Sequence, residues 1–429
     1  MSTDVSGFVS ISALLKRLST LESARKVSAE EIAAAVALIF TNSLSPVQFG
    51  VLLWALHTTN LDHKAEVLAA CASSMRDAGA QVDETALTEV LTRRRRREGT
   101  YQGGLQIDVH ALAILIMYTR QCDIVGTGGD GHNTFNVSTT SSIIASALLL
   151  MAKHGNNSST SLSGSADLLQ HAPRPPIIAA TNAANLPRIY EKTNYAFLYA
   201  REWHPGMKHG AAVRREVPVR TVFNLLGPLA NPVHDTGLME CRILGVARKD
   251  IGPNFAEALR LSGSRKALIV CGDENLDELS CAGITHCWYI HEVPGTGEEA
   301  KSSAEITCFE LAPEDFGLPR HALANVHGGK GPDENADILM QILRGQRADD
   351  DPVLHFVLLN TAALITLSGV CDADSSNMGP GDDGRVIQER GPGGLRWKEG
   401  LRRARWCVKS GEALRQWNAF VDITNTVPS

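Results

Sequence analysis

Residues 123–130 read Asp-Ile-Val-Gly-Thr-Gly-Gly-Asp, so a short apolar run passes directly into a cluster of glycines. The apolar run is typical of a buried strand, and glycines, which lack Cβ atoms, let backbone N–H groups close around an anion. Residues 136–139 (Asn-Val-Ser-Thr) bring amide and hydroxyl donors to the predicted start of a helix over 141–146, where the helix dipole favours negative charge. Residues 153–156 (Lys-His-Gly-Asn) add a mobile cation. Together these segments predict a site for a phosphorylated ligand.

The composition bounds the class of protein. The chain has 429 residues, of which 44% are apolar and 21% charged, enough for a large core and two domains. Its net charge is −6, so the molecule as a whole attracts neither nucleic acid nor an anionic membrane, and an anion site must be local. Nine cysteines occur without a CxxC pair, and residues 1–10 lack the features of a secretory signal. We therefore expect a cytosolic protein with reduced thiols.

Residues 11–79 carry a helical pattern. Ser28, three residues before a glutamate, and Ser45, directly before a proline, are typical helix starts, and Asp62 is expected to cap a third helix. One helix presents an apolar stripe made of Phe49, Leu52, Leu53 and Leu56. These residues predict a helical lobe, and such stripes could equally serve a contact between two subunits.

Beyond residue 123, strand-like and helical stretches alternate, which predicts an α/β fold with a mainly parallel central sheet covered by helices. The expected strands include 148–151, 243–246, 267–270 and 288–290. Residues 185–217 interrupt this alternation with helix-like sequence, 372–394 read as a surface loop, and 401–421 read as one closing helix. The arginine run at 93–97 is interpreted as a solvated connector in preference to a nucleic-acid contact.

Two later segments complete the pattern. Residues 224–232 read Asn-Leu-Leu-Gly-Pro-Leu-Ala-Asn-Pro, and residues 275–278 read Asn-Leu-Asp-Glu. With the three segments above, they resemble the anthranilate phosphoribosyltransferase family, in its fungal form, over nearly the whole chain. The resemblance implies a helical lobe and a larger α/β lobe of the nucleoside-phosphorylase and phosphoribosyltransferase type. It implies a homodimer and these domains: a helical domain at 1–104, to which 183–220 return, and an α/β domain at 122–182 and 221–425.

The resemblance also implies an activity. It is the Mg²⁺-dependent transfer of a phosphoribosyl group from phosphoribosyl pyrophosphate to anthranilate in tryptophan biosynthesis. An oxocarbenium-like state with a departing pyrophosphate needs positioned charge and no nucleophilic residue, so we expect no nucleophile or acid–base catalyst. Because Mg²⁺ prefers oxygen ligands, the adjacent Asp277 and Glu278 fit its requirements.

Residue roles follow from the positions that match the family's motifs. The expected residues around the sugar diphosphate are Gly126, Thr127, Gly129, Asp130, Asn136, Ser138, Thr139, Lys153 and Ser165. Those expected to line the anthranilate side are His154, Asn156, Arg214, Gly227 and Pro228, with Arg214 pairing the carboxylate. The expected metal ligands are Ser138, Asp277 and Glu278.

Simpler interpretations stay open for several of these residues. Asp277 and Glu278 could begin an exposed helix, where the dipole favours acids. His154 could be a buried histidine of the core, and Arg214, next to Arg215, could lie on a solvated basic helix face.

The sequence departs from the family pattern at three places. Asn157 and Leu162 stand where the family usually has basic residues, so we expect weaker binding of the diphosphate. Residues 106–121 form an unexpected insert where fungal members usually run on directly, and a translated, unspliced intron would produce such a segment.

Two other functions compete. A pyrimidine nucleoside phosphorylase has a similar glycine loop and similar lobes but uses inorganic phosphate, and residues 224–232 and 275–278 favour the transferase. A non-catalytic member of the fold that binds nucleic acid or a regulatory ligand would explain the arginine run, but the acidic net charge opposes it.

Overall fold

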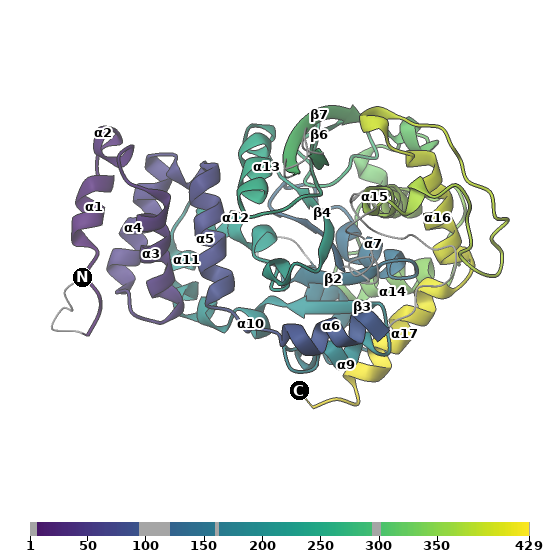
Figure 1. Ribbon diagram of the computed structural model, residues 1–429, viewed down its shortest axis with the longest axis horizontal. Coiled ribbons are helices and arrows are strands. Elements are labelled where there is room, and N and C mark those ends of the chain that lie inside the picture. The colour runs from purple at the N-terminus through teal and green to yellow at the C-terminus, as the bar shows by residue number, and fades with distance from the viewer. Residues whose placement is uncertain (1–6, 94–120, 159–162, 294–301, 429) are drawn as a thin grey trace.

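The computed structural model describes residues 7–93, 121–158, 163–293 and 302–428. A helical bundle lies at one end and a larger α/β body at the other (Figure 1). The bundle is built from α1 (Ser12–Leu18), α2 (Leu21–Ala24), α3 (Ala29–Phe40), α4 (Pro46–Thr58) and α5 (Ala65–Asp77). Within the described ranges, no helix combines the length and the apolar character needed to cross a lipid bilayer.

Local signals in the bundle behave largely as expected. The Ser28 hydroxyl accepts the Glu31 N–H and the Glu31 carboxylate accepts the Ser28 N–H, a capping box that starts α3. Ser45 caps α4 by accepting the Gln48 N–H, and the predicted stripe is buried at Phe49, Leu52, Leu53 and Leu56. The expected cap at Asp62 is wrong: α5 begins at Ala65, and Asp62 lies buried in a 3₁₀ turn, η1 (Leu61–His63), beside two histidines.

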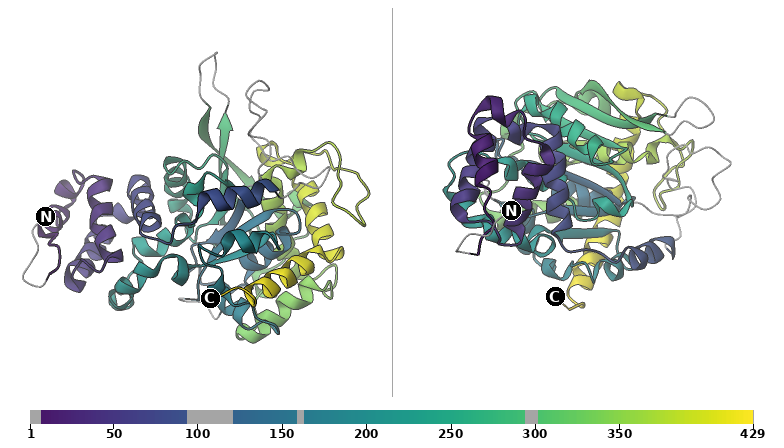
Figure 2. Two further views of the ribbon diagram at one scale, coloured as in Figure 1. Left: turned by 60° about the horizontal axis from the view of Figure 1, so that its bottom comes forward. Right: turned by 60° about the vertical axis from the view of Figure 1, so that its left-hand side comes forward.

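A seven-stranded sheet forms the centre of the α/β body, in the order β3-β2-β1-β4-β5-β6-β7. Strands β3 to β5 are parallel, whereas β6 and β7 pair antiparallel as a hairpin at one edge (Figure 2). The bounds are β1 (Gln121–Gly126), β2 (Leu150–Gly155), β3 (Tyr195–Tyr199), β4 (Met239–Gly245), β5 (Ala267–Gly272), β6 (Thr285–Val293) and β7 (Ser303–Leu311). The predicted α/β fold with a mainly parallel sheet is confirmed.

Helices cover both faces of the sheet. Along β5, Leu268 and Val270 join the core beneath α7 (Val137–Ala145), α15 (Pro352–Ser368) and α16 (Trp397–Lys409). The alternate residues Ile269 and Cys271 join a second core with α5, α12 (Val222–Leu229) and α13 (Gly252–Leu261). Because successive side chains point to opposite faces, this alternation means that the strand is buried on both sides.

The expected helix-like character of 185–217 is wrong at Tyr195–Tyr199, which form the fully buried edge strand β3. The chain then runs through α10 (Ala200–Trp203), η3 (Pro205–Gly210) and α11 (Ala211–Glu216) along the bundle. Gly206 is needed there because a Cβ would lie 2.5 Å from the Phe40 carbonyl oxygen. In the other direction, α6 (Glu84–Arg93) packs its Leu87 and Leu91 into the α/β core. The domain limits at 104 and 121 stay predictions, since residues 94–120 lie outside the described ranges.

The C-terminal segment folds as two helices, α16 and α17 (Glu412–Thr424), where one had been expected. Gly411 separates them with a φ of 74°, a left-handed conformation that glycine adopts without strain. Residues 373–391 form an extended loop over α16, as predicted.

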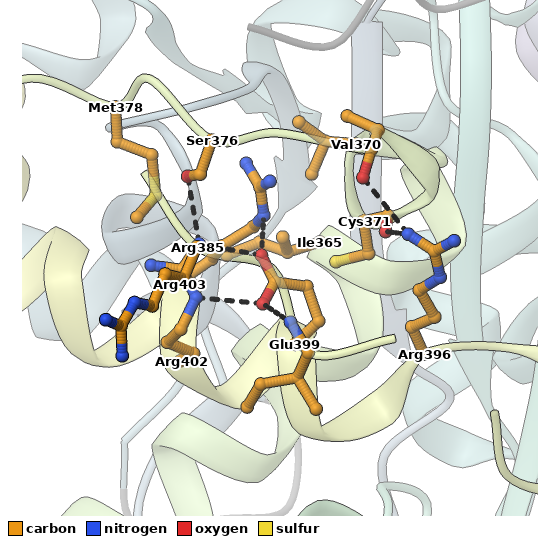
Figure 3. Close-up of polar contacts among 12 residues, drawn as sticks. Ile365, Val370, Cys371, Ser376, Met378, Arg385, Arg396, Glu399, Arg402 and Arg403 are labelled. Atoms are coloured by element: carbon orange, nitrogen blue, oxygen red, sulfur yellow. Dashed lines mark hydrogen bonds and ion pairs between the residues drawn. The ribbon is translucent and has the colours of Figure 1, made fainter. Parts of the chain in front are cut away.

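A buried charge network ties this loop to α16. Glu399 is fully buried and accepts hydrogen bonds from Arg402 (2.8 Å) and Arg403 (2.6 Å), as Figure 3 shows. Arg402 also donates to Asp382 and to Ser376 in the loop. Although burial alone would raise it, hydrogen bonds from the Met378 N–H, Ser376 and Arg402 lower the pKa of Asp382 to about 2. Arg402 therefore ties the loop to α16, and Glu399 holds Arg402 and accepts the Ile387 N–H of the loop.

We expect Glu399→Gln to destabilise the fold by about 3 kcal/mol, because it leaves the buried Arg403 guanidinium without a charged partner. The free energy of unfolding in urea measures the effect. Glu89→Gln is the control: Glu89 pairs with Arg93 on the exposed surface of α6, where such a pair contributes about 1 kcal/mol or less. A loss no larger than that of the control would contradict the structural role of Glu399.

Candidate active site

Four neighbouring parallel strands end in glycine at one edge of the sheet. They are β1, β2, β4 and β5, which end at Gly126, Gly155, Gly245 and Gly272. The helix that follows β1, α7, packs on one face of the sheet, and the helix that follows β4, α13, packs on the other. In open α/β sheets, ligands bind at the carboxyl edge where neighbouring strands send their chains to opposite faces. The glycine loop of residues 126–131 starts at this position.

The glycine loop is closed around an acid from a distant part of the chain. Gly128, Gly129 and Gly131 have φ values of 68°, 78° and 80°, which glycine adopts without strain. The Gly128 N–H donates to Asp277 Oδ2 at 2.5 Å. The predicted metal-binding acids therefore lie against the predicted phosphate loop.

This contact depends on glycine at two strand ends. A Cβ on Gly126 would lie 2.3 Å from Asp277 Oδ2. A Cβ on Gly245 would lie 1.5 Å from the Asp277 carbonyl oxygen, a backbone atom that cannot rotate away. Asp277 can therefore lie this close to the sheet only because β1 and β4 end in glycine.

The acids of the site repel one another. Burial and then the negative charge of Asp130 raise the pKa of Asp277 to about 7, although the Gly128 N–H and Arg220 lower it. Burial and then the charges of Asp277 and Asp130 hold the pKa of Glu278 well above its usual range, although the Ser138 N–H and Lys153 lower it. The interpretation of these acids as an exposed helix start is wrong, because they lie in a turn between β5 and β6.

The oxygen donors fit a hard divalent cation. Glu278 Oε2 is buried without a hydrogen-bond partner, and a cation beside it would relieve the repulsion among the acids. In the part of the chain that the structure describes, no cluster of three or more His, Cys, Asp or Glu side chains forms a complete metal cage. Mg²⁺ does not require one, since it keeps several waters and uses phosphate oxygens of its substrate.

The starts of two helices meet beside the acids. Asn136 caps α7 by accepting the Thr139 N–H at 3.3 Å, and the Thr139 hydroxyl donates to Ser165 at 2.8 Å. Ser165 opens α8 (Ser165–Gln170). Lys153, at the end of β2, is buried, which lowers its pKa to about 8, while Asp123 and Glu278 oppose that shift. The structure thus brings together hydroxyls, backbone donors and a cation at one place.

Two of the residues predicted for the aromatic substrate, His154 of β2 and Gly227 of α12, are in contact. His154 Nδ1 lies 3.2 Å from the Gly227 carbonyl oxygen, so this nitrogen carries the proton. Burial holds the pKa of His154 well below its usual range, and His204 and Lys153 lower it further, so the ring is neutral. Its Nε2 is then a buried acceptor without a partner. His154 is therefore a core histidine with one acceptor still free.

Arg214 lies on the preceding helix, α11, and packs against α12. Its guanidinium sits 5.2 Å above the ring of Phe223, four residues before Gly227 on α12. Burial lowers the pKa of Arg214, and no carboxylate pairs with it among the described residues. It makes no direct hydrogen bond to His154 or Gly227 in those residues. Next to Gly227 there is open space, since a Cβ there would meet nothing within 4 Å, and Asn156 is exposed.

A buried network that the sequence interpretation missed lies beneath the site. Asp123 in β1 accepts hydrogen bonds from Asn231 (2.9 Å), Arg242 (3.2 Å) and the His154 N–H (3.3 Å). Arg242 in β4 also donates to the Pro228 carbonyl. A signal for this network exists in the sequence, because the apolar runs Cys-Asp-Ile-Val-Gly and Cys-Arg-Ile-Leu-Gly each carry one charge at the same place. Asn231 also donates to the Ala152 carbonyl and so ties β2 to this network.

The structure describes one of the two places where a basic residue is missing. Asn157 donates to Asp167 at 2.5 Å and accepts from the Tyr199 hydroxyl at 2.6 Å. Asn157 thus fixes the shape of its loop but supplies no charge. Leu162, residues 94–97 of the arginine run and residues 106–120 of the insert lie outside the described residues. Gln121 already belongs to β1, and the residues after it pair in register with β4.

Comparison with known proteins agrees with this geometry. Residues 12–79 match the helical bundle domain of a glycosyl transferase family, and residues 119–414 match its a/b domain. The chain is 33% identical to anthranilate phosphoribosyltransferase from Schizosaccharomyces pombe over 92% of each chain. The chain belongs to the anthranilate phosphoribosyltransferase family.

Solved structures of this family have the same fold. The enzyme from Saccharomyces cerevisiae in complex with PRPP and Mg is similar with a TM-score of 0.74 at 30% identity, covering 97% of this chain and 99% of that one. The same enzyme in complex with 4-fluoroanthranilate has a TM-score of 0.71 at 29% identity and covers 97% of each chain. The family resemblance and the fold class expected from the sequence are confirmed.

We expect Gly245→Ala to weaken the binding of inorganic pyrophosphate with Mg²⁺ about tenfold or more, because the new methyl group must displace the backbone of Asp277. Isothermal titration calorimetry measures this affinity. Gly283→Ala is the matched control, since a Cβ at Gly283 would meet no atom within 4 Å. Equal affinities of the two variants would contradict the tight approach of Asp277 to the sheet.

Proposed function

We propose that this chain transfers the phosphoribosyl group from phosphoribosyl pyrophosphate to anthranilate, giving N-(5-phosphoribosyl)anthranilate and pyrophosphate in tryptophan biosynthesis. The hydrogen bond from Gly128 to Asp277 supports this most directly, because it unites a phosphate-binding loop with metal-binding acids. Family membership supports the same reaction.

In this reaction the amine nitrogen forms a bond to the sugar carbon while the bond from that carbon to the pyrophosphate oxygen breaks. Pyrophosphate takes the electron pair of the broken bond, and the amine releases one proton. Negative charge therefore collects on the leaving group. We assign its stabilisation to the glycine loop, the start of α7 and Lys153, which present fixed donors and one cation. The assigned residues are Gly126, Thr127, Gly129, Asp130, Asn136, Ser138, Thr139, Lys153 and Ser165.

Asp277, Glu278 and Ser138 would hold Mg²⁺ in this proposal. When bound, the ion neutralises charge on the departing pyrophosphate. The hydrogen bond from the Gly128 N–H to Asp277 would keep the bound ion at a fixed distance from the glycine loop. The buried, unpartnered Glu278 Oε2 supports the assignment.

Anthranilate would lie along α12, bounded by His154, Asn156, Arg214, Gly227 and Pro228. Arg214 has no carboxylate partner among the described residues and would pair the carboxylate of the substrate. The unprotonated His154 Nε2 would accept a hydrogen bond from the amine of the substrate. These contacts would orient the nitrogen toward the sugar carbon.

Anthranilate fluorescence tests the proposal. Its loss should require purified chain, phosphoribosyl pyrophosphate and Mg²⁺ together. Phosphorolysis of thymidine by inorganic phosphate, without loss of anthranilate fluorescence, would replace the proposal with a pyrimidine nucleoside phosphorylase. Absence of both reactions, with salt-sensitive binding of nucleic acid, would favour a non-catalytic member of the fold.

We expect Arg214→Met to raise the KM for anthranilate about tenfold or more, because a charge-assisted contact to the substrate carboxylate is lost. The KM for phosphoribosyl pyrophosphate should change little. Initial rates with each substrate varied in turn measure both constants. Arg215→Met serves as control, since Arg215 is the neighbouring residue on α11 and is exposed. A similar KM for anthranilate in the two variants would exclude the assigned role of Arg214.

We also propose that two copies of the chain associate through α4. Val47, Val51 and Trp54 form a row on this helix and are 75%, 47% and 50% exposed. Their spacing of four and three residues places them on one helix face, and large apolar side chains exposed together are typical of a protein contact.

Trp54→Glu should convert the dimer to a monomer, because it places a charge in the apolar contact. Light scattering coupled to size-exclusion chromatography measures the mass of the particle. Leu261→Glu is the matched control, since Leu261 is similarly exposed, at 47%, but lies on α13. A monomeric wild-type chain, or a dimer that withstands the Trp54 change, would exclude this interface.

A further inference from the structure

Arg220 connects the glycine loop to the segment that carries the residues for anthranilate. It lies between α11 and α12, and its Nη2 donates to the Gly128 carbonyl at 2.9 Å. Its Nη1 lies where a side chain on Gly129 would begin, since a Cβ there would be 1.5 Å away. The guanidinium therefore lies directly on the loop, and Gly129 is the residue that permits this approach.

The charge of Arg220 is not neutralised by a salt bridge in the part of the chain that the structure describes. Its hydrogen-bond partner there is the neutral Gly128 carbonyl, so Nε and Nη1 keep their donors for other acceptors. Some other exposed arginines do pair with acids, as Arg248 does with Asp250 and Arg320 with Glu314. Arg220 is thus a cation held by a neutral contact, and although its charge also lowers the pKa of Asp277, it forms no salt bridge among the described residues.

The backbone around Arg220 is fixed relative to both halves of the site. The next residue, Thr221, begins α12, and its N–H donates to Asn224 Oδ1 at 2.8 Å. The same helix carries Phe223 beneath Arg214 and Gly227 against His154. The position of the Arg220 guanidinium therefore depends on the helix that positions the anthranilate residues.

The negative charge of a sugar diphosphate requires cations at the site, and Arg220 is one of them. Asp130, Asp277 and Glu278 place three acids at the site, and Asn157 supplies no positive charge where the family usually has a basic residue. Apart from Arg220, the cation assigned above to the phosphate side is Lys153, and its side chain is buried. A sugar diphosphate requires more positive charge than one lysine provides.

We propose that Arg220 binds the diphosphate of the substrate through its free guanidinium donors, while its bond to Gly128 keeps the glycine loop in the binding conformation. This inference rests on the proposed function. Because one fixed side chain would contact both loop and leaving group, diphosphate binding would be coupled to the position of α12.

Three substitutions separate binding by charge from a structural role. Arg220→Gln keeps an N–H donor for the Gly128 carbonyl but removes the charge, Arg220→Met removes both, and Arg220→Lys keeps the charge without the planar group. We expect the Gln and Met variants to raise the KM for phosphoribosyl pyrophosphate about tenfold or more, with the KM for anthranilate within about twofold of wild type. The Lys variant should recover part of the loss. Arg215→Met, at an exposed position on the preceding helix α11, should behave as wild type.

The measurements are initial rates by anthranilate fluorescence with the full chain, and calorimetric titration with pyrophosphate and Mg²⁺. A wild-type KM for phosphoribosyl pyrophosphate in the Gln variant would overturn the inference, and so would a Lys variant no better than the Gln variant. If the wild-type chain binds pyrophosphate but forms no product, the proposed function fails. The same variants then still test Arg220 through pyrophosphate affinity alone.

Discussion

The site rests on the buried ion pair between Asp123 and Arg242. This pair joins the neighbouring strands β1 and β4 shortly before both strands end in glycine. Removing both charges from water is costly, and the Coulomb attraction offsets that cost only when further hydrogen bonds satisfy the remaining atoms. Here the Asp123 carboxylate also receives Asn231 and the His154 N–H, and Arg242 also donates to the Pro228 carbonyl. The pair therefore fixes β1, β2, β4 and the end of α12 relative to one another.

The charges of Asp123 and Arg242 neutralise each other, whereas the acids above them at the strand ends do not have such partners among the described residues. At the strand ends, three acids lie close together and the pKa values of Asp277 and Glu278 are raised. Raised pKa values mean that the protein alone stabilises the ionised acids poorly, so a cation and an anionic ligand bound together would complete the charge balance. The strands beneath hold the acids in this arrangement, and their terminal glycines leave room for Asp277.

Much of this could be predicted from the sequence because it is local. The glycine loop, the polar donors before a helix at 141–146 and the stripe on α4 each lie in one short stretch of sequence, although α7 begins earlier than expected, at Val137. Strand β3 was missed because its five buried residues, Tyr-Ala-Phe-Leu-Tyr, show no alternation of polar and apolar character and lie among helical segments. The contacts of Arg220 and Arg242 were missed because they join residues 92 and 119 positions apart, a relation set by strand order and invisible in local spacing. The sequence could name Asp277, but only the fold could place it on Gly128.

The helical bundle takes part in the site through α12, although it contributes few of the predicted ligand contacts. Arg76 on α5 donates to the Leu229 carbonyl at the end of α12 and to Asp235 just beyond it. Phe40 and Phe49 from the bundle pack edge-on against Phe223, the residue beneath Arg214. Through these contacts the bundle supports α12, which carries Gly227 and lies under Arg214. Because Arg242 of β4 also donates to the Pro228 carbonyl, α12 links the bundle to the strands that end at the glycine loop.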